Sequence, residues 1–476
     1  MTDLRDASRR RTKLVCTLGP ATEGRVESLV AAGMDVARIN FSHGTAATHV
    51  AAARSVREAA GEPIAIMVDL AGPKIRLGEL VDGSVDLEPG RPFLLRTATG
   101  ADPLGDIEGA SVSYPRLPID VRVGDPILLA DGAAQLRVVT IEDDGVHTEV
   151  VRGGTVRDRA GVAIPTERLS SPALTERDRA DAPRATELGA DWIAQSFVRR
   201  ADDVRTLRSV LGRDGPPIVA KIETRPAVDN IDEILAVADA VMIARGDLGV
   251  ELPYEQVPIV QKQLVRRALD LGVPTIVATQ MLESMTNAPR PTRAEASDVA
   301  NAVFDGADAI MLSGVTAIGA FPLLAAEAAV LIATLCETDG AAYLAAGMSL
   351  PPGTDTGALA YAAVALTGAH PGIEAIACYT RTGVTARVLA SMRPKVPIVA
   401  FTPDPTSAAR LALSHGVVAR PCAVLDATAD RIGALGRLLD ATGLIRSGAT
   451  VVLVTSTATP GSGPTLVGIH RVGEPG

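Results

Sequence analysis

Eight short apolar segments recur along the chain, and most are followed by an Ala- and Leu-rich stretch with helical spacing. Strands that alternate with helices in this way pair in parallel, and eight such units predict a closed (β/α)8 TIM barrel. Periodicity alone leaves a doubly wound open sheet as the alternative. Aromatic residues make up only 3% of the chain, so Val, Ile, Leu and Ala must form the core, as in buried parallel strands. The predicted strands span residues 13–19, 35–41, 64–71, 190–198, 217–223, 240–246, 274–280 and 307–314.

Two regions depart from this pattern. From Gly72 to Gly161, Pro and Gly separate short alternating stretches, which predicts an all-β insertion. It leaves the barrel after the third strand, at the end where active sites form, so we expect it to act as a lid. Five strand-like runs near the C-terminus, the first four separated by helical stretches, predict a further α/β domain. The predicted division assigns 1–71 and 162–335 to the barrel, 72–161 to a β-barrel-like lid and 345–476 to a C-terminal α/β effector domain.

Net charge, the length of apolar runs and cysteine spacing argue against several classes of protein. A net charge of −10 disfavours a general nucleic-acid or anionic-membrane surface. No apolar run approaches the roughly 18 residues that a membrane span needs, and the basic N-terminal residues lack the apolar core of a secretory signal. The four cysteines have no metal-ligand spacing, as is typical of reduced thiols. We therefore expect a cytoplasmic protein that binds neither nucleic acid nor membranes.

Polar residues gather at the predicted carboxyl ends of the barrel strands, where TIM-barrel active sites lie. Lys221 and Glu223 end the fifth strand, Asp247 follows the sixth and Thr279 ends the seventh. Residues two apart face the same side of a strand, which places the Lys221 ammonium beside Glu223. Carboxylates on adjacent strands suit a hard divalent cation, and a neighbouring ammonium suits developing negative charge. The set predicts a metal-dependent enzyme for a small phosphorylated acid; the alternative for any one residue is an ion pair at the barrel rim.

Three further residues could bind an anion. Gly246 permits close backbone approach, and free amides at the Gly246–Gly249 turn would suit a carboxylate or phosphate. Arg38 and Arg76 follow different strands and could clamp phosphate groups in a bidentate manner. Either arginine alone would equally serve as a rim salt bridge.

Several longer segments resemble blocks of the pyruvate kinase family. They run in family order over most of residues 13–314: VCTLGP, ARINFSHG, AGPKIRLG, AKIE, ARGDLGVELP, ATQMLESM, RPTRAEASDVANAV and DGADAIMLSG. The predicted plan of a barrel with a β lid and a C-terminal α/β domain also resembles that family. The resemblance implies the glycolytic transfer of a phosphoryl group from phosphoenolpyruvate to ADP, giving pyruvate and ATP.

The resemblance also implies roles for the strand-end residues. Glu223 and Asp247 match ligands of Mg²⁺ or Mn²⁺, and Lys221 matches the lysine that stabilises the transferring phosphoryl group and the enolate. Thr279 and the Gly246–Asp247 backbone match the substrate-carboxylate site, with Thr279 near the proton path. On this basis the catalytic residues are Lys221, Thr279 and Arg38, the last as a phosphate ligand. Nucleotide contacts are implied for Asn40, His43 and Arg76.

The monovalent-cation region departs from the common family pattern. Asn40, Ser42 and Asp69 match ligands of K⁺, but members that depend on K⁺ usually carry Thr at the position of Leu70 and Glu at that of Lys74. Lys74 brings a fixed positive charge to this region. We therefore predict that activity does not require K⁺.

Other departures lie on the nucleotide and lid side. The usual SGETA block has Val315 in place of its carboxylate, and Ile318 replaces a nearby lysine. The lid lysine that reaches the nucleotide phosphates is Ala160 here, with Arg157 or Arg159 as substitutes of different shape. Two alternatives therefore stay open: a paralogue that uses the metal–enolate site for lyase or aldolase chemistry, and a weakly active regulatory homologue.

The C-terminal domain contains one candidate ligand loop. Hydroxyls, a glycine and helix amides in Thr380–Thr385 suit a phosphate, and the segment resembles the family's effector loop. An ordinary capped strand–helix turn is the alternative. The resemblance implies a phosphorylated effector bound by Thr380, Thr382, Gly383 and Thr385, and a homotetramer.

Overall fold

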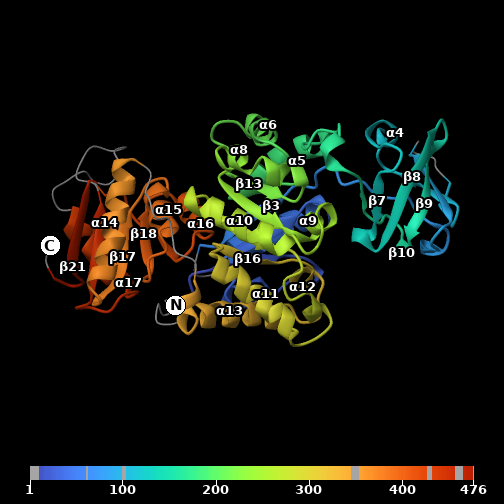
Figure 1. Ribbon diagram of the computed structural model, residues 1–476. Helices are drawn as coiled ribbons and strands as arrows, with labels where there is room; N and C mark the ends of the chain where they lie inside the picture. Colours follow the sequence, from blue (N-terminus) through green and yellow to red (C-terminus); the bar gives the residue numbers. More distant parts are fainter. Residues whose placement is uncertain are drawn as a thin grey trace.

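The computed structural model describes residues 10–59, 63–98, 103–344, 353–425, 431–455 and 465–474. The eight predicted barrel strands close into one parallel barrel in the order β1-β16-β15-β14-β13-β12-β3-β2 (Figure 1). This closure confirms the (β/α)8 prediction and rules out the open sheet. The strands are β1 (Lys13–Thr17), β2 (Val36–Asn40), β3 (Ala65–Asp69), β12 (Trp192–Gln195), β13 (Ile218–Ile222), β14 (Ala240–Ala244), β15 (Thr275–Ala278) and β16 (Ala309–Leu312).

Alternate side chains of the strands enter two different cores. Val15 and Met242 belong to the cluster inside the barrel, whereas their neighbours Leu14 and Ile243 pack in the layer between strands and helices. The outer layer contains α2 (Val26–Ala31), α3 (Ala46–Glu58), α5 (Glu176–Glu187), α6 (Ala201–Leu211), α7 (Arg225–Asp229), α8 (Ile231–Leu235), α9 (Arg245–Glu251), α10 (Val257–Asp270), α11 (Arg293–Asp305), α12 (Gly314–Ala317) and α13 (Pro322–Thr338).

The insertion after β3 is built from β-sheets, as predicted, with one short helix. A six-stranded sheet has the order β11-β7-β8-β9-β5-β6, and β10 pairs with β4 in a second sheet. Phe93, Leu95 and Leu136 are fully buried in a core of its own. Its elements are β4 (Ser84–Leu87), β5 (Pro92–Thr97), β6 (Gly109–Val112), α4 (Leu117–Asp120), β7 (Pro126–Leu129), β8 (Ala134–Glu142), β9 (Gly145–Arg152), β10 (Gly154–Arg157) and β11 (Val162–Ala163).

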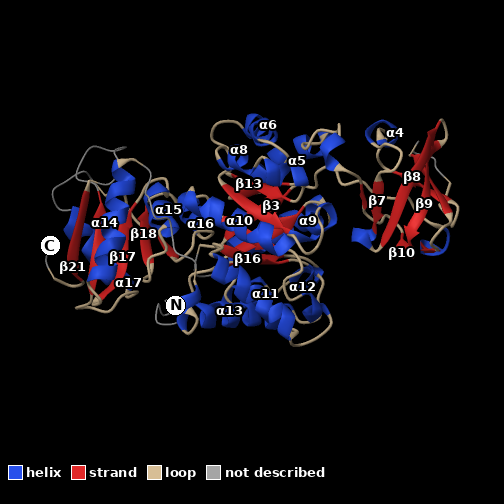
Figure 2. Ribbon diagram, in the orientation of Figure 1, coloured by secondary structure: helices blue, strands red, loops and turns tan. Residues whose placement is uncertain are grey.

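The C-terminal domain is a five-stranded sheet covered by helices on both faces (Figure 2). The strand order is β19-β18-β17-β20-β21, and only the β20–β21 pair is antiparallel. Buried residues of α14, α15 and α16 pack on one face, and those of α17 pack on the other. The elements are α14 (Asp355–Ala369), β17 (Ile373–Tyr379), α15 (Val384–Ser391), β18 (Ile398–Thr402), α16 (Pro405–Leu411), β19 (Val417–Pro421), α17 (Arg431–Thr442), β20 (Thr450–Thr455) and β21 (Leu466–Arg471).

The lid and the C-terminal domain lie on opposite sides of the barrel (Figure 1). The C-terminal domain docks where the barrel strands begin: Leu413 packs onto the inner barrel core, and Arg393 binds Asp308 at 2.9 Å in a buried ion pair. The lid connects where β3 ends. The carboxyl ends of the strands, which carry the candidate residues, therefore face the lid.

Candidate functional site

Lys221 of β13 lies at the centre of a buried polar cluster at the barrel mouth. Its Nζ donates to Ser196 Oγ at 2.7 Å and lies 3.3 Å from Glu223 Oε2 and 3.5 Å from Asp69 Oδ1. Lys221 and Glu223 project to the same side, as predicted from their spacing. Asp69 ends β3, so the cluster joins strands that are distant in the sequence.

Arg38, the middle residue of β2, completes the charge balance around Asp69. Its guanidinium donates to Asp69 Oδ2 through Nε at 2.8 Å, approaches the same oxygen through Nη2 at 2.7 Å, and donates to Thr17 Oγ1 at 3.0 Å. Burial alone would raise the pKa of Asp69, but the charges of Lys221 and Arg38 hold it below its usual value. Asp69 is thus a buried anion shared by two cations.

Opposing effects also act on Lys221 and Glu223. Burial favours the neutral amine, but the charges of Asp69 and Glu223 outweigh it and raise the pKa of Lys221. Burial raises the pKa of Glu223, Lys221 opposes this shift and the charge of Asp247 adds to it. Glu223 Oε1 accepts from the Phe197 amide at 2.7 Å, whereas the buried Oε2 has the Lys221 ammonium 3.3 Å away but no hydrogen bond among the described residues. A buried carboxylate oxygen in this state, beside a second carboxylate, fits a ligand for a divalent cation.

Asp247 lies in α9 rather than on a strand, because β14 ends at Ala244, two residues before the predicted end. Its Oδ1 forms an ion pair with Lys74 Nζ at 3.1 Å, and both side chains are about one-third exposed. Lys74 belongs to the segment that leads from β3 into the lid. One cation therefore links the lid connection to a predicted metal ligand.

Thr279 and Gln280 follow β15 with backbone φ angles of +67° and +57°. A β-branched residue rarely adopts this conformation, and it persists only where surrounding contacts enforce it. The Gly246 amide, which we predicted to be a free donor, instead donates to Thr279 Oγ1 at 2.7 Å. Thr279 Oγ1 in turn donates to the Ala278 carbonyl at 2.6 Å.

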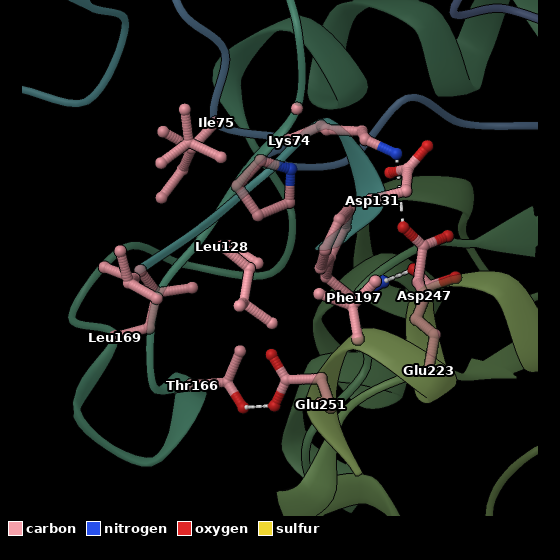
Figure 3. Close-up of a pocket in the computed structure, with 16 residues that line it drawn as sticks. Lys74, Ile75, Leu128, Asp131, Thr166, Leu169, Phe197, Glu223, Asp247 and Glu251 are labelled. Atoms are coloured by element: carbon pink, nitrogen blue, oxygen red, sulfur yellow. Dashed lines mark hydrogen bonds and ion pairs between the residues drawn. The ribbon is translucent and has the colours of Figure 1, made fainter. Parts of the chain in front are cut away.

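A small cavity opens between the barrel mouth and the lid segment that carries Thr166 and Leu169 (Figure 3). Glu223, Asp247 and Lys74 line its barrel side, and Thr166 and Leu169 line the opposite side. Glu251 faces the same space and accepts from Thr166 Oγ1 at 2.5 Å. Glu223 and Asp247 line this cavity, so a ligand held by their carboxylates would lie in it or beside it.

The remaining site predictions fall around the lid connection. Asn40 Oδ1 accepts from the Ser42 amide at 3.0 Å, and Leu70 is buried. His43 lies at the surface. Partial desolvation of its ring and the charges of Arg76, Arg38 and Lys74 lower its pKa. Arg76 Nη1 donates to the Arg159 carbonyl at 3.2 Å. The effect of the Arg76 charge on His43 indicates that both side chains lie in one positively charged region.

The residues that depart from the family pattern lie in different environments, some buried and some exposed. Val315 is fully buried in the outer barrel core, where an unpaired carboxylate would be costly. Ile318 is 69% exposed. Ala160 packs against the lid core, and Arg159, with a φ of +56°, binds Glu79 at 2.5 Å. Arg157 is exposed in β10.

Sequence reasoning missed three residues of this site. Ser196 and Phe197 follow β12 and contact Lys221 and Glu223, and Glu251 lies one helical turn after Asp247. The first two could have been found by treating the end of the fourth strand like the other strand ends. Glu251 gives a weaker signal, since only its spacing of four from Asp247 places it on the same helix face.

The predicted effector loop forms a strand–helix turn between β17 and α15. Thr380 and Thr385 are buried, and Gly383 has a φ of +78° at the start of the helix. Arg387 Nη1 donates to the Thr382 carbonyl at 3.3 Å. The turn lies in the domain on the far side of the barrel from the cavity (Figure 1).

Comparisons with known proteins agree with this architecture. The family profile "Pyruvate kinase, barrel domain" matches residues 9–326, and "Pyruvate kinase, alpha/beta domain" matches residues 357–467. Proteins named pyruvate kinase from Mycobacterium intracellulare and Geobacillus stearothermophilus are 42% and 40% identical; the alignments cover 98% of this chain and 99% and 81% of those proteins. The crystal structure of a pyruvate kinase from Cryptosporidium parvum superposes with a TM-score of 0.88 at 33% identity, covering 98% of this chain and 97% of that one.

Within the described residues, no helix combines the length and apolar character needed to span a membrane. The fold and the similarity over nearly the full length agree. The chain belongs to the pyruvate kinase family.

Proposed function

We propose that this protein transfers the phosphoryl group of phosphoenolpyruvate to ADP, giving pyruvate and ATP. The observation that carries the proposal is the position of Lys221, which contacts Asp69 and Glu223. Glu223 in turn lines a cavity together with Asp247. Phosphoryl transfer needs positioning and neutralisation of charge more than covalent chemistry. A buried ammonium between carboxylates supplies both.

The proposal assigns the predicted residues to separate parts of the reaction. Glu223 and Asp247 bind Mg²⁺ or Mn²⁺, which when bound would neutralise charge on the substrate oxygens. Lys221 and Arg38 stabilise the transferring phosphoryl group, and Lys221 also stabilises the enolate. Thr279 and the Gly246–Asp247 backbone orient the substrate carboxylate, and the Gly246 amide does so through the Thr279 hydroxyl to which it donates. Asn40, His43 and Arg76 contact the nucleotide.

The bond changes are those of a single group transfer followed by protonation. The bond from phosphorus to the enol oxygen breaks as a bond to a terminal phosphate oxygen of ADP forms. The enolate then takes a proton at its methylene carbon to give pyruvate, and Thr279 lies near the path of that proton. Lys221 stays protonated throughout, as its raised pKa favours.

Several finer statements belong to the same proposal. The enzyme is cytoplasmic, does not require K⁺, and forms a homotetramer regulated by a phosphorylated effector at Thr380, Thr382, Gly383 and Thr385. Its domains divide at the limits given above: 1–71 with 162–335, 72–161 and 345–476. The lyase and regulatory alternatives are not favoured, because relatives matched over nearly the whole chain are named pyruvate kinase.

A coupled assay tests the proposal. With phosphoenolpyruvate, ADP and Mg²⁺ we expect ATP and pyruvate in equal amounts, and no product when the divalent cation is chelated. Metal-dependent exchange of pyruvate methyl protons without ATP formation would support the lyase alternative instead. Absence of both activities would favour the regulatory one.

A further inference from the structure

Arg245 is a buried cation between the ends of β14 and β15, and the proposed mechanism assigns it no role. Arg245 is only 8% exposed to solvent. Nη1 donates to Asp298 Oδ1 at 2.5 Å, and Nη2 donates to the Thr279 carbonyl at 2.7 Å. Longer contacts of 3.4 Å reach the Ala278 carbonyl and Gln261. Most of the guanidinium is thus engaged on the strand end that carries Thr279.

The strand end that it binds is strained. Thr279 and Gln280 both have positive φ angles, which cost free energy for residues other than glycine. The Thr279 carbonyl points at the guanidinium, so the charge of Arg245 stabilises this orientation of the peptide. Without that donor, the partly buried carbonyl would lose its described partner and the turn would be free to relax.

The side chain of Thr279 is held by the residue next to Arg245. The Gly246 amide donates to Thr279 Oγ1, so the backbone and hydroxyl of Thr279 are both fixed from the first turn of α9. The same turn carries Asp247. Any shift of Arg245 would therefore move Thr279 relative to Asp247.

We infer that Arg245 is a positioning residue for the substrate-carboxylate and protonation end of the site, acting through Thr279 and Gly246. Asp298 of α11 orients the guanidinium. The inference rests on the proposed function, because that proposal gives Thr279 and Gly246 their roles. A purely structural ion pair would stabilise the barrel without affecting one substrate more than the other.

The chain offers a matched control. Arg393 is also buried, binds the carboxylate of Asp308 at 2.9 Å and donates to the Gly306 carbonyl at 2.7 Å, but it lies at the opposite end of the barrel. Arg245→Gln and Arg393→Gln therefore remove comparable contacts. Arg245→Lys keeps a charge near Asp298, although one ammonium cannot reproduce the forked contacts of the guanidinium.

The experiment measures KM for phosphoenolpyruvate and ADP, kcat, and the exchange of pyruvate methyl protons with deuterated solvent, each per folded enzyme. Moving a positioned group by about 1 Å lowers the rate by about 10²-fold. We expect losses of that order in kcat and proton exchange for Arg245→Gln, a raised KM for phosphoenolpyruvate and little change in KM for ADP. Arg245→Lys and Asp298→Asn should give smaller losses in the same direction.

Arg393→Gln should lower thermal stability and leave kcat, the rate of proton exchange and both KM values unchanged. The inference is overturned if Arg245→Lys and Asp298→Asn, as folded proteins, show wild-type proton exchange and KM values, or if both substrates are affected equally. Proton exchange is measured without ADP. It therefore tests Arg245 even if the wild-type enzyme forms no ATP, which would refute the proposed function alone.

Discussion

Lys74 Nζ lies 3.1 Å from Asp247 Oδ1, and this ion pair joins the segment entering the lid to the helix that carries a proposed metal ligand. The two residues are far apart in the sequence, and only barrel closure brings them together. The pair places a positive charge beside the cavity, in the region whose sequence resembles a monovalent-cation site.

This contact underlies the prediction about K⁺. Because Lys74 already supplies a charge, initial rates should be equal with K⁺, Na⁺ or a bulky organic cation at constant ionic strength. Lys74→Glu should lower the rate without K⁺, because it places a third carboxylate near Asp247. Strong stimulation of the wild-type enzyme by K⁺ would refute the prediction.

Glu223 should control affinity for the divalent cation. Glu223→Gln removes one anionic oxygen, so we expect Mn²⁺ binding, followed by electron paramagnetic resonance, to weaken by at least about tenfold. The value of kcat should fall by about 10²-fold or more. Glu251→Gln changes a carboxyl group that lines the same cavity but has no assigned ligand role. Equal Mn²⁺ affinity in the two variants would argue against the assignment.

Glu251 should make stability depend on pH. Burial, opposed by the Thr166 hydrogen bond, raises the pKa of Glu251 from 4.5 to about 7. In the unfolded chain the carboxyl group has its ordinary pKa of 4.5. The free energy of unfolding therefore keeps the full contribution of the neutral carboxyl group below pH 4.5 and loses it as the pH rises through 7.

Glu251→Gln stays neutral and keeps an acceptor for Thr166. Its free energy of unfolding should exceed that of wild type by about 2 kcal/mol near pH 8, where the partly exposed carboxylate is ionised, and by little near pH 5. Denaturant titrations across this range measure the difference, with exposed Glu255→Gln as the control. A constant difference at all pH values would contradict the prediction.

The effector loop gives a prediction about regulation. Sugar phosphates or AMP should raise the initial rate at low phosphoenolpyruvate, and Thr382→Val should weaken this response by removing a hydroxyl at the helix start. Because the loop lies on the far side of the barrel from the cavity, the basal rate at saturating substrate should be unchanged. Flat titrations with every phosphorylated compound would refute the regulatory role.

The sequence predicted the barrel because its strands are continuous apolar runs that end in polar residues. The same logic placed Lys221 beside Glu223, since residues two apart share one face of a strand. The same logic, applied to the end of the fourth strand, would also have indicated Ser196. It could not predict that Lys74 binds Asp247, because that contact depends on how segments distant in the chain meet. The positive φ of Thr279 likewise reflects tertiary contacts that override local preference.

The lid insertion also has a consequence for how the chain folds. Met67 of β3 pairs with Trp192 of β12, although the whole lid lies between them. Closing a disordered loop as long as residues 77–160 costs about 2 kcal/mol more than closing an ordinary turn of about six residues. Within the folded lid, however, Arg76 bridges Gly161, so the two ends of the insertion are already adjacent. A lid that folds first would bring β3 and β12 together, and mutations in its core should then slow the closure of a barrel that they do not touch.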